Sequence, residues 1–213
     1  MAITDDLSIQ QNFVDGAIAT LIFAHGAGAN MDSVFMTEFT QLLNERHINV
    51  IRFNFPYMQQ RLIDGKRRPP SKMDVLKESY INRIKQHSPE LPLFIGGKSM
   101  GSRVAAMVAD EDKVSGVICI GYPFHPQKKP EKLRLEPLQN TDRPVVIVQG
   151  DRDALGNKTE INDYGLANNI HVYFVEDGDH DLKPRVKSGF THLQHKITAA
   201  NLIKSFIEEQ SKC

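Results

Sequence analysis

The stretch that decides the fold is Leu93-Phe94-Ile95-Gly96-Gly97-Lys98-Ser99-Met100-Gly101-Ser102-Arg103-Val104. Its apolar start, 93–95, predicts a strand, and the amphipathic run 104–109 predicts a helix that follows after a very tight turn. Residues 97–101 fit the G-x-S-x-G pattern of the nucleophile elbow, in which one serine stands at the apex of the turn. The flanking glycines have no Cβ, so strand and helix can pack closely. We therefore expect the Ser99 hydroxyl to lie exposed above the sheet, beside a helix N-terminus that favours negative charge.

Strand and helix patterns alternate on both sides of this stretch. The apolar runs that predict further strands are 19–24, 49–53, 114–121, 144–148 and 170–175. Further helices are predicted after Ser33, over 73–87, over 160–167 and over 192–209. Residues 1–15 are polar and predict an edge strand or a loose tail, while 54–71 and 122–139 read as irregular covering loops. Alternation of this kind predicts a parallel, doubly wound α/β sheet of about six to seven strands.

Length and composition narrow the class of protein. A chain of 213 residues is most simply one domain spanning 1–213, and its zero formal net charge points away from nucleic-acid or membrane-surface partners. The two cysteines, Cys119 and Cys213, are far apart, so we expect no disulfide and a reducing environment. We read no signal peptide at the N-terminus and no apolar run near the ~20 residues of a spanning helix. The sequence therefore predicts a soluble cytoplasmic protein, either a monomer or a homodimer.

Polar residues that can carry chemistry follow the predicted strands. They are the glycine-rich loop 25–28, Ser99, the pair Asp151 and Asp153, and His180. In open α/β sheets, ligands bind beyond the carboxyl ends of the strands, so these residues should gather at one edge. Their chain order of serine, aspartate and histidine, with room between them for the intervening helices and strands, is the order of a catalytic triad in this kind of sheet.

Acidic residues surround His180 in the turn 177–181, which raises the alternative of a metal site. A calcium-binding EF-hand loop that begins at residue 177 would need glycine at its sixth position and glutamate at its twelfth. Those positions hold Leu182 and Ser188. We therefore expect no metal and no cofactor.

Three segments carry a resemblance to a known family: residues 21–30 (Leu-Ile-Phe-Ala-His-Gly-Ala-Gly-Ala-Asn), 97–102 (Gly-Lys-Ser-Met-Gly-Ser) and 178–182 (Gly-Asp-His-Asp-Leu). From about residue 19 onward the chain resembles the small, capless α/β-hydrolases. Within them it is similar to a group that includes testis-expressed hydrolase-like proteins, the hydrolase-like domain of a chromatin-complex subunit and bacterial relatives. The resemblance implies a three-layer sandwich without a cap domain. We expect the first antiparallel strands of larger members to be missing.

The triad order and this resemblance together assign roles at the strand ends. Ser99 is the expected nucleophile, and His180 is the general base that takes its proton. The resemblance places the acid a turn beyond the last glycine of its strand, which favours Asp153 over Asp151. Asp151 is then a turn residue.

The remaining site residues are expected around the elbow. The oxyanion hole would use the backbone N–H groups of Met100 and Ala27. Lys98 is expected to support the turn and not to act as an acid or base. His25 is interpreted mainly as a residue that organises its loop. Residues expected to contact the substrate are His25, Gly26, Gly28 and Tyr122.

Two functions from different classes remain open. The first is a serine hydrolase, similar to carboxylesterases and thioesterases, that acts on a small-molecule ester, thioester or related acyl substrate through an acyl-enzyme. The second is a catalytically weak or inactive hydrolase-like scaffold that binds a partner. The filled triad favours catalysis. The basic run 66–68 is interpreted as a solvated loop, with attraction of an anionic substrate as the alternative.

Overall fold

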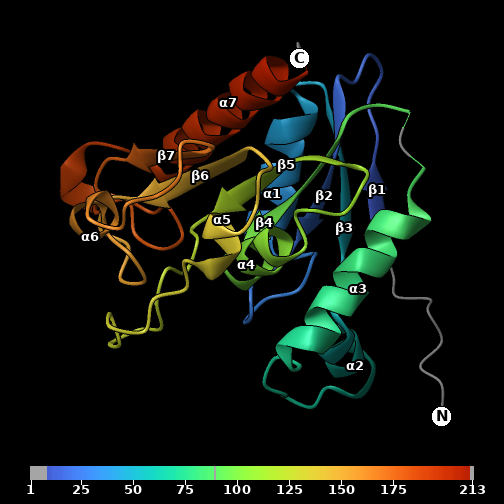
Figure 1. Cartoon of the computed structure of the whole chain (residues 1–213), viewed down its shortest axis with the longest axis horizontal. Helices are drawn as coiled ribbons and strands as arrows, with labels where there is room; N and C mark the ends of the chain where they lie inside the picture. The colour runs from blue at the N-terminus through green and yellow to red at the C-terminus, as the bar shows by residue number, and fades with distance from the viewer. Residues whose placement is uncertain (1–8, 89, 212–213) are drawn as a thin grey trace.

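A computed structural model describes residues 9–88 and 90–211. Seven strands form one sheet in the order β1-β3-β2-β4-β5-β6-β7 (Figure 1). Only the edge pair of β1 and β3 is antiparallel, and every other neighbouring pair is parallel. The strands are β1 (Ile9–Asn12), β2 (Ala19–Ala24), β3 (Ile48–Phe53), β4 (Leu93–Lys98), β5 (Val114–Ile120), β6 (Val145–Gly150) and β7 (Ile170–Val175).

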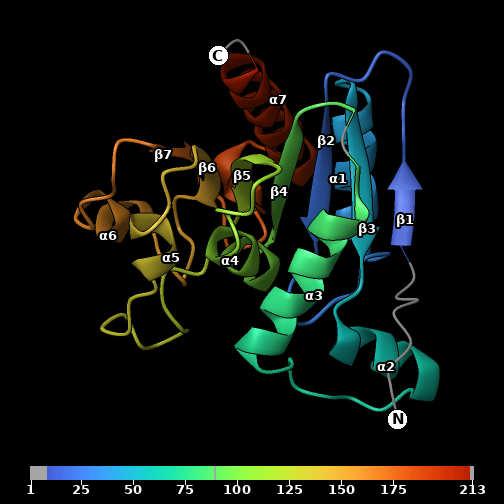
Figure 2. The same ribbon diagram turned by 45° about the vertical axis from the view of Figure 1, so that its right-hand side comes forward.

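Helices cover both faces of this sheet, as Figure 2 shows. They are α1 (Val34–Asn44), α2 (Pro56–Asp64), α3 (Met73–Gln86), α4 (Met100–Met107), α5 (Glu136–Gln139), α6 (Lys158–Asn162) and α7 (His192–Gln210), with a 3₁₀ turn at Val186–Ser188. Helices α1 and α7 pack on one face, and the other helices lie on the opposite face. No helix in the described ranges is long and apolar enough to cross a membrane.

The two faces bury two separate apolar clusters. On one face, Phe39 of α1 and Ile203 of α7 pack against strand residues such as Phe23. On the other face, Tyr80 of α3 donates a hydrogen bond to the carbonyls of Ile22 and Gly96, which ties the helix to two central strands. Strands β2, β4 and β6 are buried along their whole length, which explains their unbroken apolar character. The predicted three-layer α/β architecture is confirmed, and the described residues contain no cap domain.

Two predictions about local structure were wrong. Residues 54–71 are not all loop, because Pro56 occupies the first turn of α2, where its missing N–H costs nothing. The expected absence of the first antiparallel strands also fails, since β1 pairs with β3 from Ile9↔Phe53 to Asn12↔Val50, which confirms the edge-strand alternative for residues 1–15. The rest of the predicted N-terminal tail, residues 1–8, lies outside the described residues. The segment 122–139 is irregular as predicted, apart from the short α5.

Candidate active site

The turn after β4 places one side chain at the carboxyl end of the sheet. Ser99 has φ 54° and ψ −115°, and α4 begins at the very next residue. A left-handed φ at a residue with a side chain costs of order 1–3 kcal/mol and persists only where the surroundings fix it. They do so here: a Cβ on Gly97 would lie 2.6 Å from the carbonyl oxygen of Ala24, and one on Gly101 would lie 2.4 Å from it. The two glycines therefore let the turn press against the end of β2.

Three side chains from distant parts of the chain meet at this turn. His180 Nε2 lies 2.7 Å from Ser99 Oγ, and His180 Nδ1 lies 2.7 Å from Asp153 Oδ2. Because a carboxylate only accepts hydrogen bonds, the neutral imidazole carries its proton on Nδ1 and accepts the serine proton at Nε2. Asp153 is fully buried and the His180 side chain is about a quarter exposed. The arrangement can therefore draw the proton from the serine hydroxyl while the carboxylate stays out of water.

The Asp153 carboxylate is fixed by two more donors. The backbone N–H of Leu155 donates to Oδ1 at 2.8 Å, and the buried Gln149 amide donates to Oδ2 at 2.8 Å. Asp151, two residues earlier, instead accepts a hydrogen bond from the N–H of Lys158 through its main-chain carbonyl. Of the two candidate acids, Asp153 is the one that His180 meets. Gln149 was not predicted, because a single glutamine at a strand end carries no distinctive spacing.

The loop after β2 lies beside Ser99 and is organised by a buried histidine. His25 Nε2 accepts a hydrogen bond from the N–H of Phe55 at 3.1 Å, so Nδ1 carries the proton and donates to the Gly26 carbonyl at 2.6 Å. Burial lowers the pKa of His25 to about 4, although the bond to Gly26 opposes that shift. His25 is therefore neutral near pH 7 and holds the backbone of its loop.

A second side chain fixes the same loop from α2. The Tyr57 hydroxyl donates to the carbonyl of Ala27 at 2.9 Å, with a longer contact of 3.4 Å to that of Gly26. Ala27 lines the cavity next to Ser99. Met100 is the first residue of α4, so its N–H has no acceptor inside the helix. The two residues expected to form the oxyanion hole, Ala27 and Met100, thus both lie beside Ser99.

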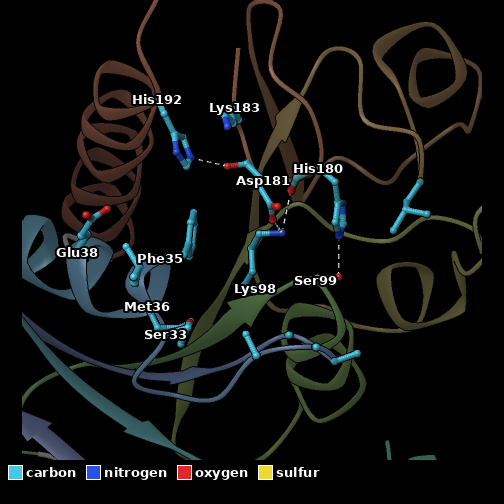
Figure 3. Close-up of a pocket in the computed structure, with 16 residues that line it drawn as sticks. Ser33, Phe35, Met36, Glu38, Lys98, Ser99, His180, Asp181, Lys183 and His192 are labelled. Carbon is cyan, nitrogen blue, oxygen red and sulfur yellow. Dashed lines mark hydrogen bonds and ion pairs between the residues drawn. The ribbon is translucent and has the colours of Figure 1, made fainter. Parts of the chain in front are cut away.

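A cavity of about 730 Å³ opens beside Ser99 and His180 (Figure 3). Ser99 and His180 lie at one end, and the ring of Phe35 and the side chain of Lys98 form the middle. Glu38, Lys183 and His192 lie toward the other end. The cavity is thus a groove with an apolar wall in its middle, at Phe35 and Met36, beside the Lys98 side chain, and with polar groups at its far end.

Comparison with known proteins identifies the family. A family model described as an alpha/beta hydrolase domain matches residues 17–208. The chain belongs to that family. Its α/β-hydrolase fold is shared with a serine hydrolase homologue from Coxiella burnetii (17% identity, TM-score 0.68, covering 93% of this chain and 90% of that one). It is also shared with a dienelactone hydrolase from Anabaena variabilis (16% identity, TM-score 0.70, covering 96% of this chain and 93% of that one). A lidless serine hydrolase from Xanthomonas campestris has it as well (17% identity, TM-score 0.65, covering 97% of this chain and 88% of that one). At these identities the likeness concerns the fold, while the family supports a hydrolase.

Two residues expected to contact the substrate of this hydrolase domain do not line the cavity. His25 and Tyr122 are both fully buried. The Tyr122 hydroxyl donates to the carbonyl of Arg134 at 2.9 Å, and its ring packs edge-on against Phe124. Both aromatic rings are therefore committed to the protein interior. Gly26 and Gly28 do line the cavity.

The cavity walls of the hydrolase domain also differ from the prediction. Neither 54–71 nor 122–139 contributes to the lining, which comes instead from the start of α1 and from residues between His180 and His192. Lys98, expected to support the turn, reaches away from it to the carbonyl of His180 and to Asp181. These walls were missed because they depend on how α1 and α7 pack together.

Proposed function

We propose that this chain is a serine hydrolase that cleaves a small ester, thioester or related acyl substrate through an acyl-enzyme on Ser99. The observation that carries the proposal is the pair of 2.7 Å contacts that link Ser99, His180 and Asp153. Membership of the alpha/beta hydrolase domain family supports it.

The mechanism follows from the donor and acceptor roles of the three groups. His180 Nε2 takes the proton as Ser99 Oγ attacks the substrate carbonyl carbon, and Asp153 stabilises the imidazolium that forms. The tetrahedral intermediate collapses when the imidazolium returns the proton to the leaving group, whose bond to carbon breaks. Water then attacks the acyl-enzyme by the same route and releases the acid and free serine.

The oxyanion would be held by the N–H groups of Met100 and Ala27. Both are main-chain donors on rigid elements, one at the start of α4 and the other in the loop fixed by His25 and Tyr57. Fixed donors need no reorganisation when charge develops on the carbonyl oxygen, and each typically lowers the barrier by about 3 kcal/mol.

The substrate class follows from the cavity. Its apolar middle at Phe35 and Met36 suits a short acyl or aryl group, and the polar far end suits a substrate with a polar tail. A volume of about 730 Å³ accommodates a small molecule.

The test uses p-nitrophenyl ester and acyl-thioester series of increasing chain length. Wild-type protein should turn over short members with a burst of leaving group, whereas Ser99→Ala should lose at least about 10⁴-fold in kcat. A fluorophosphonate should label the wild type and not Ser99→Ala. A folded wild-type protein that neither reacts with the probe nor hydrolyses any member would overturn the proposal and favour the scaffold alternative.

A further inference from the structure

The side chain immediately before the nucleophile makes no contact that the proposed mechanism uses. Lys98 is the last residue of β4, and its side chain is only 8% exposed. Its ammonium group donates a hydrogen bond to the main-chain carbonyl of His180 at 2.8 Å and forms an ion pair with Asp181 at 3.1 Å (Figure 3). One side chain from the strand of the nucleophile thus holds two consecutive residues of the loop that carries the histidine.

The neighbouring strands leave room for this bridge. A Cβ on Gly121, at the end of β5, would lie 2.7 Å from the His180 carbonyl oxygen and 3.2 Å from Lys98 Nζ. At the end of β6, a Cβ on Gly150 would lie 2.3 Å from the carbonyl oxygen of Asp179. The loop that carries His180 therefore packs directly against the main chain at Gly121 and Gly150, where there is no side chain.

The bridge is also supported from the cavity side. The Nε2 atom of His192 lies 2.8 Å from the carbonyl oxygen of Asp181. The Lys98 ammonium lies 5.8 Å from the centre of the Phe35 ring. Groups from β4 and α7 thus contact residues 180 and 181, and Phe35 of α1 lies against Lys98. Burial lowers the pKa of Lys98, while the charges of Asp181, Asp153 and Asp179 oppose that shift.

Stability alone does not explain a buried ammonium group at this position. Removing a cation from water costs several kcal/mol, and an apolar side chain of similar volume often stabilises a protein as well or better. The presence of a lysine here therefore needs a reason other than packing, and its contacts supply one because both hold the histidine segment.

We propose that Lys98 is a positioning residue that fixes the His180 loop so that Nε2 stays within hydrogen-bonding distance of Ser99 Oγ. This inference rests on the proposed hydrolase function. Lys98 acts through His180: it keeps the base in place and transfers no proton. Small displacements of a catalytic group can cost about 100-fold in rate.

The test compares Lys98→Met with Lys113→Met. Lys113 also donates to a histidine main-chain carbonyl, that of His87 at 3.1 Å, but it lies just before β5, at the end of the sheet away from the elbow. Lys98→Met should lower kcat about 100-fold and leave KM within about threefold, because the groove is kept while the base is displaced. The rate of fluorophosphonate labelling should fall by the same factor. Lys113→Met should keep wild-type kinetics.

Asp181→Asn gives a second, milder variant. It removes the ion pair but leaves the bond from Lys98 to the His180 carbonyl, so a loss of about three- to tenfold in kcat is expected. Thermal unfolding of each variant tests whether its fold is intact. If Lys98→Met fails to fold, wild-type kinetics in Asp181→Asn overturn the inference.

The outcomes separate this inference from the function on which it rests. Wild-type labelling rate and kcat in folded Lys98→Met overturn the positioning role and leave the hydrolase proposal standing. A wild-type protein that is not labelled at all overturns the hydrolase proposal, and the positioning role fails with it.

Discussion

The turn that carries Ser99 and the loop that carries His180 reach the same hydrogen bond by different means. At the turn, the constraints lie in the main chain: two glycines pack against the Ala24 carbonyl, and Ser99 takes a left-handed φ. The loop from 176 to 183 also contains left-handed residues, Asp177 and Leu182, but side chains from elsewhere hold it.

The contacts on the loop come from several elements. Arg152, after β6, donates two hydrogen bonds to the Asp177 carbonyl at 3.1 and 2.8 Å, and the N–H of Arg185 donates to the Asp177 carboxylate at 2.7 Å. Lys98 holds the His180 carbonyl. Ser99 is therefore positioned by close main-chain packing, whereas His180 is positioned largely by side chains from other parts of the chain. Substitutions at the Ser99 turn and substitutions that affect the His180 loop should therefore have different effects.

The largest expected effect concerns the partner of the base. Asp153→Asn should lower kcat by about 10³–10⁴-fold, because an amide at this position no longer favours the tautomer with the proton on Nδ1. Asp151→Asn should cost less than about tenfold, since His180 meets Asp153 instead. Steady-state hydrolysis by the two folded variants checks this. A greater loss in Asp151→Asn would show that the acid has been misassigned.

A change at the turn should act on stability. In Gly97→Ala the new methyl group would meet backbone atoms of Ala24 and Gly101 at 2.6 Å, and neither chain segment can move freely. We expect a loss of at least about 3 kcal/mol in the free energy of unfolding. Urea unfolding measures it, with Gly28→Ala as the control because nothing lies within 4 Å of a Cβ there. Equal stability of the two variants would contradict the claim that the turn is fixed by its main chain.

A smaller effect on stability should appear as a pH dependence at the loop beside the turn. Burial lowers the pKa of His25 to about 4, below the value near 6.5 of an unfolded chain. Between these values the unfolded state binds the proton and the folded state does not, so the stabilisation is present above pH 6.5 and is lost as the pH falls toward 4.

The loss attributable to His25 is about 3 kcal/mol between pH 7 and pH 4. His25→Asn lacks the titrating group, so its stability should fall less steeply over that range. Urea unfolding at a series of pH values checks this. Parallel curves for wild type and variant would mean that His25 is not held neutral.

The same contrast explains what the sequence could predict. The central strands are buried on both faces and appear as unbroken apolar runs, and the elbow has a local glycine spacing, so the fold and Ser99 could be found. Position after a strand pointed to His180 and to the pair Asp151 and Asp153, and the family resemblance favoured Asp153 of the two. Helix α2 was missed because it is short, Pro56–Asp64, and buries only Tyr57 and Met58. Edge strand β1 is mostly exposed and gave no alternating pattern.

The parts of the site that could not be predicted depend on long-range packing. Lys98 and His180 are 82 residues apart, and the missing side chains of Gly121, just after β5, and of Gly150, at the end of β6, leave room for the loop that carries His180. Tyr122 follows a strand end, as Ser99 does, but its ring turns inward. Position after a strand locates a residue near the site, and only the packing decides whether its side chain faces the cavity.

The most direct test of the account is to map the adduct formed by a fluorophosphonate. Intact-mass analysis followed by peptide mapping should find one phosphonyl group per wild-type chain, on the peptide that contains Ser99, and a much slower reaction in Asp153→Asn. Modification at another serine, or an equal labelling rate in Asp153→Asn, would contradict the claim that Ser99, His180 and Asp153 act together as a catalytic triad.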